Sequence, residues 1–180
     1  GEVCNMVGVV MSVPISRRIG KRSTFAVSCI GMAILSCFFF YLPCTNVGFV
    51  TMLLLQILIS VCTGIISPLI WSMYADVADY AAIKDNTSST GLIFSSGSMA
   101  QKFGGAIAGS AVLWLFASFG LVPNALHQTD SAILGMKLTM SYIPAAVAVI
   151  MVVIMVVYPL TKSKMKDINA KLKDIRKIEY

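Results

Sequence analysis

The stretch from residue 91 to residue 119 contains a single charged side chain, Lys102, among residues that are otherwise apolar, small or hydroxylic. At ~1.5 Å per helical residue, this stretch is long enough to cross the ~30 Å core of a bilayer. Lys102 would then lie ~16 Å below one surface, close to the midplane. An unpaired ammonium at that depth costs at least ~2.5–3.5 kcal/mol. The stretch therefore predicts a membrane helix whose lysine has a function.

The composition favours a membrane protein with several spans over a soluble domain. Hydrophobic residues make up 57% of the chain and charged residues 12%, whereas soluble domains carry roughly 25% charged residues. We find no nucleotide-binding glycine loop, no GxSxG motif and no metal-spaced set of histidines and cysteines. We therefore expect neither an enzyme nor a metal or cofactor site. The five cysteines form no CxxC pair, and His127 is expected to be a solvated loop residue.

The apolar stretches predict an all-α, polytopic transmembrane bundle. The expected complete spans are residues 24–42, 47–74, 91–119 and 136–160. Residues 1–15 are apolar but too short to cross a membrane. They are expected to end a helix whose beginning lies upstream, so that the chain is a fragment. Pro68 is expected to kink the second span, and Pro144 either kinks the fourth or marks its start.

The positive charges alternate along the chain and predict its topology. Residues 16–22, 76–89 and 161–180 hold twelve of the fourteen Lys and Arg residues, and the loops between the other spans hold none. By the positive-inside rule these three segments, including the C-terminus, are expected to be cytoplasmic. This segregation argues against a nucleic-acid site. The tail, residues 161–180, predicts a basic amphipathic helix that lies either on the anionic leaflet or on the protein's own loops.

Lys102 shares one helical face with two serines and with small residues. Ser95, Ser98 and Gly105 lie on this face, where hydroxyls can bind a substrate or the ammonium and a glycine allows a neighbour to approach. We expect the face to contact protein or a water-filled cavity. No carboxylate of known depth matches Lys102, so its partner is expected upstream, or at Glu2. Snorkelling and a static ion pair that fixes helix packing remain alternatives.

Two further groups of residues are candidates for function. Trp71 either stacks on a sugar ring or lies in the aromatic belt at the membrane interface. Acidic and basic side chains meet on the cytoplasmic side, where they either form ion pairs that close a gate or stay solvated. These candidate gate residues are Asp76, Asp79, Arg17, Arg18, Lys21 and Arg22.

Several motifs resemble one transporter family. They are Gly20-Lys21-Arg22, Asp76-Val-Ala-Asp79-Tyr80, Thr90-Gly-Leu-Ile-Phe-Ser-Ser, Ala100-Gln-Lys102-Phe-Gly-Gly and Leu134-Gly-Met-Lys-Leu-Thr-Met-Ser-Tyr-Ile-Pro144. Together they are similar to the glycoside–pentoside–hexuronide:cation symporters of the major facilitator superfamily. The resemblance implies that residues 1–15 end helix 8 and that the four spans are helices 9 to 12. The chain would then be the C-terminal half of a transporter whose N-terminal half is missing.

The resemblance also implies a function. Such proteins are bacterial inner-membrane symporters that move a sugar, glycoside or oligosaccharide with Na⁺ or H⁺ by alternating access, and they use no cofactor beyond the coupling ion. Lys102 matches a helix 11 lysine near the cation-binding carboxylates of the N-terminal half, and Ser98 matches a position that faces the sugar cavity. The chain departs from the family in lacking an arginine just before Gly91. Trp71 lies about one turn closer to the cytoplasm than the cavity tryptophan of the melibiose permease. A lipid or lysolipid carrier of the same fold and a non-transporting membrane scaffold remain alternatives.

Overall fold

The computed structural model describes residues 2–42, 46–85, 89–123, 128–160, 162–165 and 167–168. Its regular structure in these ranges is helical, as the sequence predicts. The helices are α1 (Glu2–Ile19), α2 (Lys21–Phe40), α3 (Asn46–Asp85), α4 (Thr90–Ser118), α5 (Asp130–Met140) and α6 (Tyr142–Val157). His127 and most of the tail lie outside the described residues.

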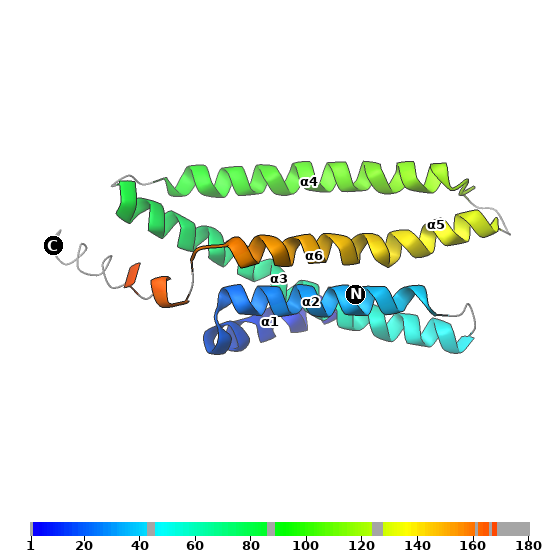
Figure 1. Cartoon of the computed structure of the whole chain (residues 1–180), viewed down its shortest axis with the longest axis horizontal. Coiled ribbons are helices and arrows are strands. Elements are labelled where there is room, and N and C mark those ends of the chain that lie inside the picture. The colour runs from blue at the N-terminus through cyan, green and yellow to red at the C-terminus, as the bar shows by residue number, and fades with distance from the viewer. Residues whose placement is uncertain are drawn as a thin grey trace.

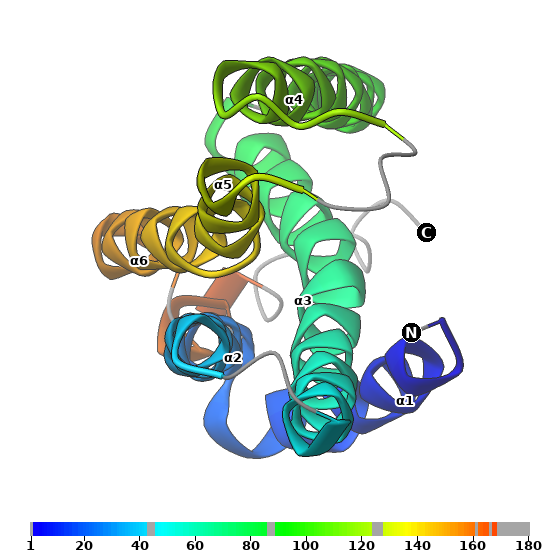
Figure 2. The same ribbon diagram turned by 90° about the vertical axis from the view of Figure 1, so that its right-hand side faces the viewer.

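The long helix α3 connects the two sides of the bundle. It packs on α1 and α2, with its contacts to α2 extending as far as Asp76, and its last part also reaches α4 (Figures 1 and 2). Helices α2 and α6 lie side by side, and α5 adjoins α4. The buried core lies between α2 and α3, where Phe25 and Cys29 meet Ile66 and Leu69, and α6 side chains such as Met155 cover it.

Three helical stretches are long and apolar enough to cross a membrane: Lys21–Phe40, Val47–Lys84 and Asp130–Val157. Helix α4 is not among them, although its bounds agree with the predicted stretch of 91–119 to within one residue at each end. The polar pair Gln101 and Lys102, together with its serines and glycines, lowers its hydropathy. That α4 crosses the membrane therefore stays a prediction.

Two helices extend beyond their predicted ends, and the intervening loops are shorter than expected. Helix α1 includes Arg17 and Arg18, so the predicted loop of residues 16–22 is reduced to Gly20. Gly20 has a φ of 90°, which glycine adopts without strain, and its N–H donates to the Ser16 carbonyl at 2.9 Å. Helix α3 continues past residue 74 to Asp85 because this polar stretch is rich in alanine, a strong helix former.

The last membrane stretch begins earlier than predicted and is broken. Helix α5 begins at Asp130 instead of residue 136, because the Thr129 hydroxyl accepts a hydrogen bond from the Ala132 N–H at 3.3 Å and caps the helix. The break lies at Ser141, which has a φ of −115° and a ψ of −77°. Pro144 lacks the N–H that would donate to the Met140 carbonyl, which explains a break one turn before the proline.

Helices α1 and α3 cross at two glycines. A Cβ atom on Gly8 would collide with the Val61 carbonyl oxygen, and one on Gly64 would collide with the Asn5 carbonyl oxygen. The missing side chains let the two backbones touch, as small residues do in membrane helix pairs. This contact attaches α1 to the first half of α3.

Candidate functional site

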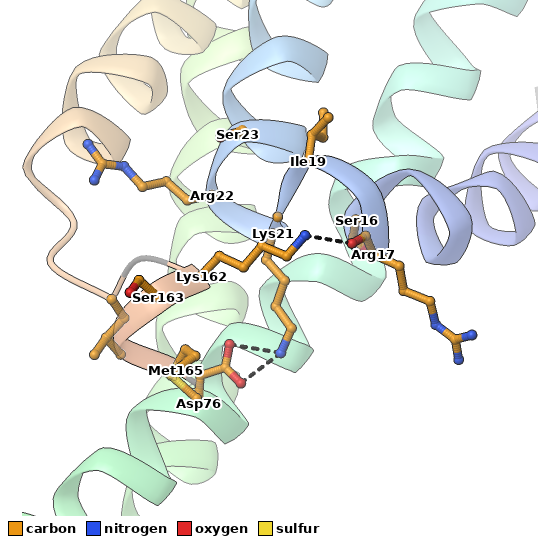
Figure 3. Close-up of a pocket in the computed structure, with 12 residues that line it drawn as sticks. Ser16, Arg17, Ile19, Lys21, Arg22, Ser23, Asp76, Lys162, Ser163 and Met165 are labelled. Atoms are coloured by element: carbon orange, nitrogen blue, oxygen red, sulfur yellow. Dashed lines mark hydrogen bonds and ion pairs between the residues drawn. The ribbon is translucent and has the colours of Figure 1, made fainter. Parts of the chain in front are cut away.

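An ion pair joins the start of α2 to the last part of α3. The Lys21 ammonium lies 2.7 and 2.8 Å from the two carboxylate oxygens of Asp76, and it also donates to the Ser72 carbonyl at 3.3 Å. The tight turn at Gly20 positions Lys21 to face α3 (Figure 3). The side chain of Asp76 is 13% exposed and that of Lys21 is 37% exposed. The pair is therefore partly screened from water.

Two other cationic side chains connect the region of the α1–α2 turn to the end of α6 and to the residues that follow it. Lys162 donates from Nζ to the Arg17 and Arg18 carbonyls at 2.8 and 2.9 Å. These carbonyls belong to the last turn of α1 and accept no backbone hydrogen bond within the helix. The Lys162 ammonium therefore caps the C-terminus of α1. Arg22 donates from Nη2 to the Val156 carbonyl at 2.7 Å, near the end of α6. The first hairpin and the last helix are thereby held together.

A cavity of about 670 Å³ opens between the α1–α2 turn, Asp76 and a group of residues after α6, namely Leu160, Lys162, Ser163 and Met165 (Figure 3). Tyr158 lies next to this region, directly after α6 and outside the candidate span. Burial, and then the negative charge of Asp76, raise the pKa of Tyr158 to about 12. Its hydroxyl is buried and has no hydrogen-bond partner among the described residues.

The structure joins only part of the predicted gate set. Lys21 and Asp76 form an ion pair, and the Arg22 guanidinium binds a backbone carbonyl rather than a carboxylate. Arg17 and Arg18 are exposed, and their guanidinium groups have no partner among the described residues. The half-buried Asp79 also has none within the described part of the chain. The sequence did not indicate whether Asp76 or Asp79 would pair with Lys21.

The predicted face of Lys102 is open in the structure. Lys102 and all of residues 101–110 are exposed, and a Cβ on Gly105 would meet nothing within 4 Å. The hydroxyls of Ser95 and Ser98 donate to carbonyls of their own helix, at 3.0 and 2.9 Å, instead of to a partner helix. No described carboxylate pairs with Lys102. The expected packing partner of this face is therefore absent from the described residues.

The structure argues against Glu2 as the partner of Lys102. Glu2 begins α1, and Figure 2 shows α1 and α4 at opposite ends of α3. No extensive contact links α1 to α4 among the described residues. An upstream partner stays a prediction.

An aromatic cluster that the sequence analysis missed attaches α4 to α3. Trp71 stacks on Phe94, with ring centroids 6.2 Å apart and planes at 12°, and Tyr74 meets Trp71 edge-on at 5.8 Å. The Tyr74 ring lies against Gly97, where a Cβ would collide with it. Trp71 remains 39% exposed, so one ring face is covered and part of the side chain is open. The sequence carries no local signal for this contact, because it depends on how α3 and α4 pack.

The three apolar candidate spans, together with the ion pair near their ends, define a polytopic membrane protein. Residues 2–162 match the family described as MFS/sugar transport protein. The chain belongs to this family, which confirms the resemblance stated from its motifs. The family consists of transporters rather than enzymes.

Three proteins with similar sequences carry the names of transporters. The chain is 29% identical over 182 residues to the glucuronide carrier protein homolog of Escherichia coli (strain K12), which covers 98% of this chain and 39% of the relative. It is 24% identical over 172 residues to a putative glycoside/cation symporter of the same organism, covering 96% and 37%. A putative 2,3-dihydroxypropane-1-sulfonate exporter, also from this organism, is 24% identical over 152 residues, covering 84% and 32%. The chain thus spans at most about two fifths of the length of these relatives.

Proposed function

We propose that this chain forms the C-terminal half of a secondary active transporter that moves a sugar, glycoside or oligosaccharide together with Na⁺ or H⁺ by alternating access. The observation that carries the proposal is the family match over residues 2–162. Relatives named as a glucuronide carrier homolog and a putative glycoside/cation symporter support the substrate class. The rest of the transporter would supply the N-terminal half and the other side of the substrate cavity.

In this proposal Lys102 belongs to the coupling site. Lys102 is exposed on α4, near the exposed Ser95 and the half-buried Ser98, and no described carboxylate pairs with it. A charge at this depth requires a water-filled cavity or a carboxylate partner. Carboxylates of the other half would pair with Lys102 when the coupling cation is absent and release it when the cation binds. Trp71, partly open beside α4, would border the same cavity.

The Lys21–Asp76 pair would act as a latch on the cytoplasmic side. It ties the α1–α2 turn to the end of α3 that leads into α4. The basic segments on this side support its cytoplasmic placement. A shift of α2 against the last part of α3 would break the pair when the cavity opens toward the cytoplasm.

The test uses the full-length transporter in proteoliposomes and the substitution Lys102→Ala. Lys84→Ala is the matched control, because Lys84 is also an exposed lysine on a long helix and has no partner among the described residues. We expect Lys102→Ala to abolish accumulation of a radiolabelled glucuronide or glycoside against its gradient, under either a Na⁺ or a H⁺ gradient. Exchange of substrate at equal concentrations should persist, since it needs no net coupling.

Uphill accumulation by Lys102→Ala at the level of Lys84→Ala would refute the coupling role. Competition by lipid headgroups in place of sugars would refute the substrate class and favour a lipid carrier. Uptake that depends on neither gradient would refute symport itself.

A further inference from the structure

The cavity at the α1–α2 turn has an excess of positive charge. Among the described residues, four basic side chains and one carboxylate line it, a formal excess of three positive charges. We propose that this cavity binds the phosphate group of an anionic phospholipid. The proposal does not rest on the transported substrate or on the coupling ion.

The excess charge is not neutralised by the contacts that hold the cations. Lys21 pairs with Asp76, which is the only carboxylate among the described lining residues. Lys162 and Arg22 bind backbone carbonyls, which carry no net charge. Figure 3 shows the guanidinium groups of Arg17 and Arg22 pointing outward on opposite sides of the cavity. The cavity and its rim therefore offer uncompensated positive charge, and hydrogen bonds to backbone carbonyls fix the Lys162 and Arg22 side chains in place.

The lining supplies hydrogen-bond donors as well as charge. An ammonium has three N–H donors, and the hydrogen bonds of Lys162 to the Arg17 and Arg18 carbonyls use two of them. The hydroxyls of Ser23 and Ser163 line the cavity and have no partner among the described residues. Apolar side chains such as Leu160 and Met165 complete the wall. Charged donors beside hydroxyls and apolar groups suit a phosphodiester that is attached to a glycerol and acyl chains.

The position of the cavity favours a lipid over a soluble anion. It lies where α2 begins and α6 has just ended, and both helices belong to candidate membrane spans. Their exposed side chains along the span are apolar, including Ile34 on α2 and Val153 and Ile154 on α6. Such faces suit acyl chains, whereas the polar face of α4 does not. At the ends of lipid-facing helices, the cavity lies at headgroup depth.

The test compares binding of phosphatidylglycerol and phosphatidylcholine to the full-length transporter in detergent, by native mass spectrometry and by thermal stability. We expect phosphatidylglycerol to bind and to stabilise the protein, and phosphatidylcholine to do so far less. High salt should weaken the preference, because the attraction is electrostatic.

Ser163→Glu is the informative variant, because it places a negative charge inside the cavity at an exposed side chain that makes no described contact. Thr90→Glu is the matched control. It makes the same change from hydroxyl to carboxylate at an exposed residue at the same end of the bundle (Figure 1) but outside the cavity. One charge near an anionic lipid surface corresponds to about a fivefold change in affinity. We expect Ser163→Glu to weaken phosphatidylglycerol binding by at least about fivefold and Thr90→Glu to leave it within about twofold.

Three results would overturn the proposal. Equal losses in Ser163→Glu and Thr90→Glu would mean that the attraction is general and not located in the cavity. Inorganic phosphate that stabilises the lipid-free protein and displaces phosphatidylglycerol would assign the cavity to a soluble anion. A transporter that ignores phosphatidylglycerol, yet loses stability in Ser163→Glu, would indicate that an acidic segment of the protein itself fills the cavity.

Discussion

Breaking the Lys21–Asp76 pair tests whether it is a latch or only a local contact. Exposed ion pairs contribute about 0.2–1 kcal/mol, and removing one partner of a buried pair costs about 3–5 kcal/mol. The side chain of Asp76 is 13% exposed and that of Lys21 is 37% exposed. The free energy that the pair contributes should therefore lie between the values for exposed and buried pairs, nearer the value for exposed pairs. We expect a coupling energy of about 1–2 kcal/mol between the two side chains.

This energy sets the expected change in the gating equilibrium. If the pair exists only while the cytoplasmic side is closed, its loss shifts the equilibrium toward the open state by a factor of roughly 5–30. In Asp76→Asn, the Lys21 ammonium retains the Ser72 carbonyl, so the loss of stability should stay moderate.

The assay is the rate at which a cysteine at position 98 reacts with a membrane-impermeant thiol reagent added at the cytoplasmic side. It uses a full-length protein whose native cysteines are replaced and compares Lys21→Gln, Asp76→Asn and the double variant. Both single changes should raise the labelling rate, and the double variant should add little to either. Asp79→Asn lies one turn further along α3, where the carboxylate has no partner among the described residues, and should leave the rate within about twofold. Additive effects of Lys21→Gln and Asp76→Asn, or unchanged labelling in both, would refute the latch.

The helix contacts at glycines give two further predictions, each measured as the apparent melting temperature of the full-length protein. Gly97→Ala should destabilise it by about 1–2 kcal/mol because the new methyl displaces the Tyr74 ring, whereas Gly104→Ala, which meets nothing within 4 Å, should be neutral or slightly stabilising. Gly64→Ala should cost about 3 kcal/mol because it forces a backbone carbonyl of α1 away, whereas Gly31→Ala makes only an ordinary contact and should be tolerated. A pair of variants with equal melting temperatures would contradict the corresponding helix contact.

The sequence predicted which segments are helical better than it predicted where they end. Helix α4 agrees with its prediction because an apolar run between polar turns delimits it on both sides. Helix α1 continues through Arg17 and Arg18, and helix α3 continues through residues 75–85. Charged residues indicate where a helix leaves the membrane, but the backbone hydrogen bonds of the helix continue beyond that point. Helix α5 begins early because the Thr129 cap outweighs the low hydropathy of the residues that follow it.

The sequence predicted which types of residue form the candidate site, but not which of these residues contact one another. Acidic and basic groups were expected on one side, yet the choice of Asp76 over Asp79 depends on the rotation of α3 beneath the Gly20 turn. The capping of α1 by Lys162 joins residues far apart in the chain and has no local signal. The same holds for the aromatic contact between α3 and α4, because stacking of Trp71 on Phe94 depends on how the two helices pack.

Lys21 and Lys102, the two lysines at the centre of the proposal, differ in where their interaction partners lie. Lys21 is satisfied within this chain by Asp76 and by a backbone carbonyl, so its contact can act as a latch without any other part of the protein. Lys102 has no described partner and lies on an exposed helix face. Hydrocarbon cannot cover such a face at low cost, whereas it suits the apolar sides of α2 and α6. We therefore expect the rest of the transporter to meet the chain along α4, while α2 and α6 face the lipid.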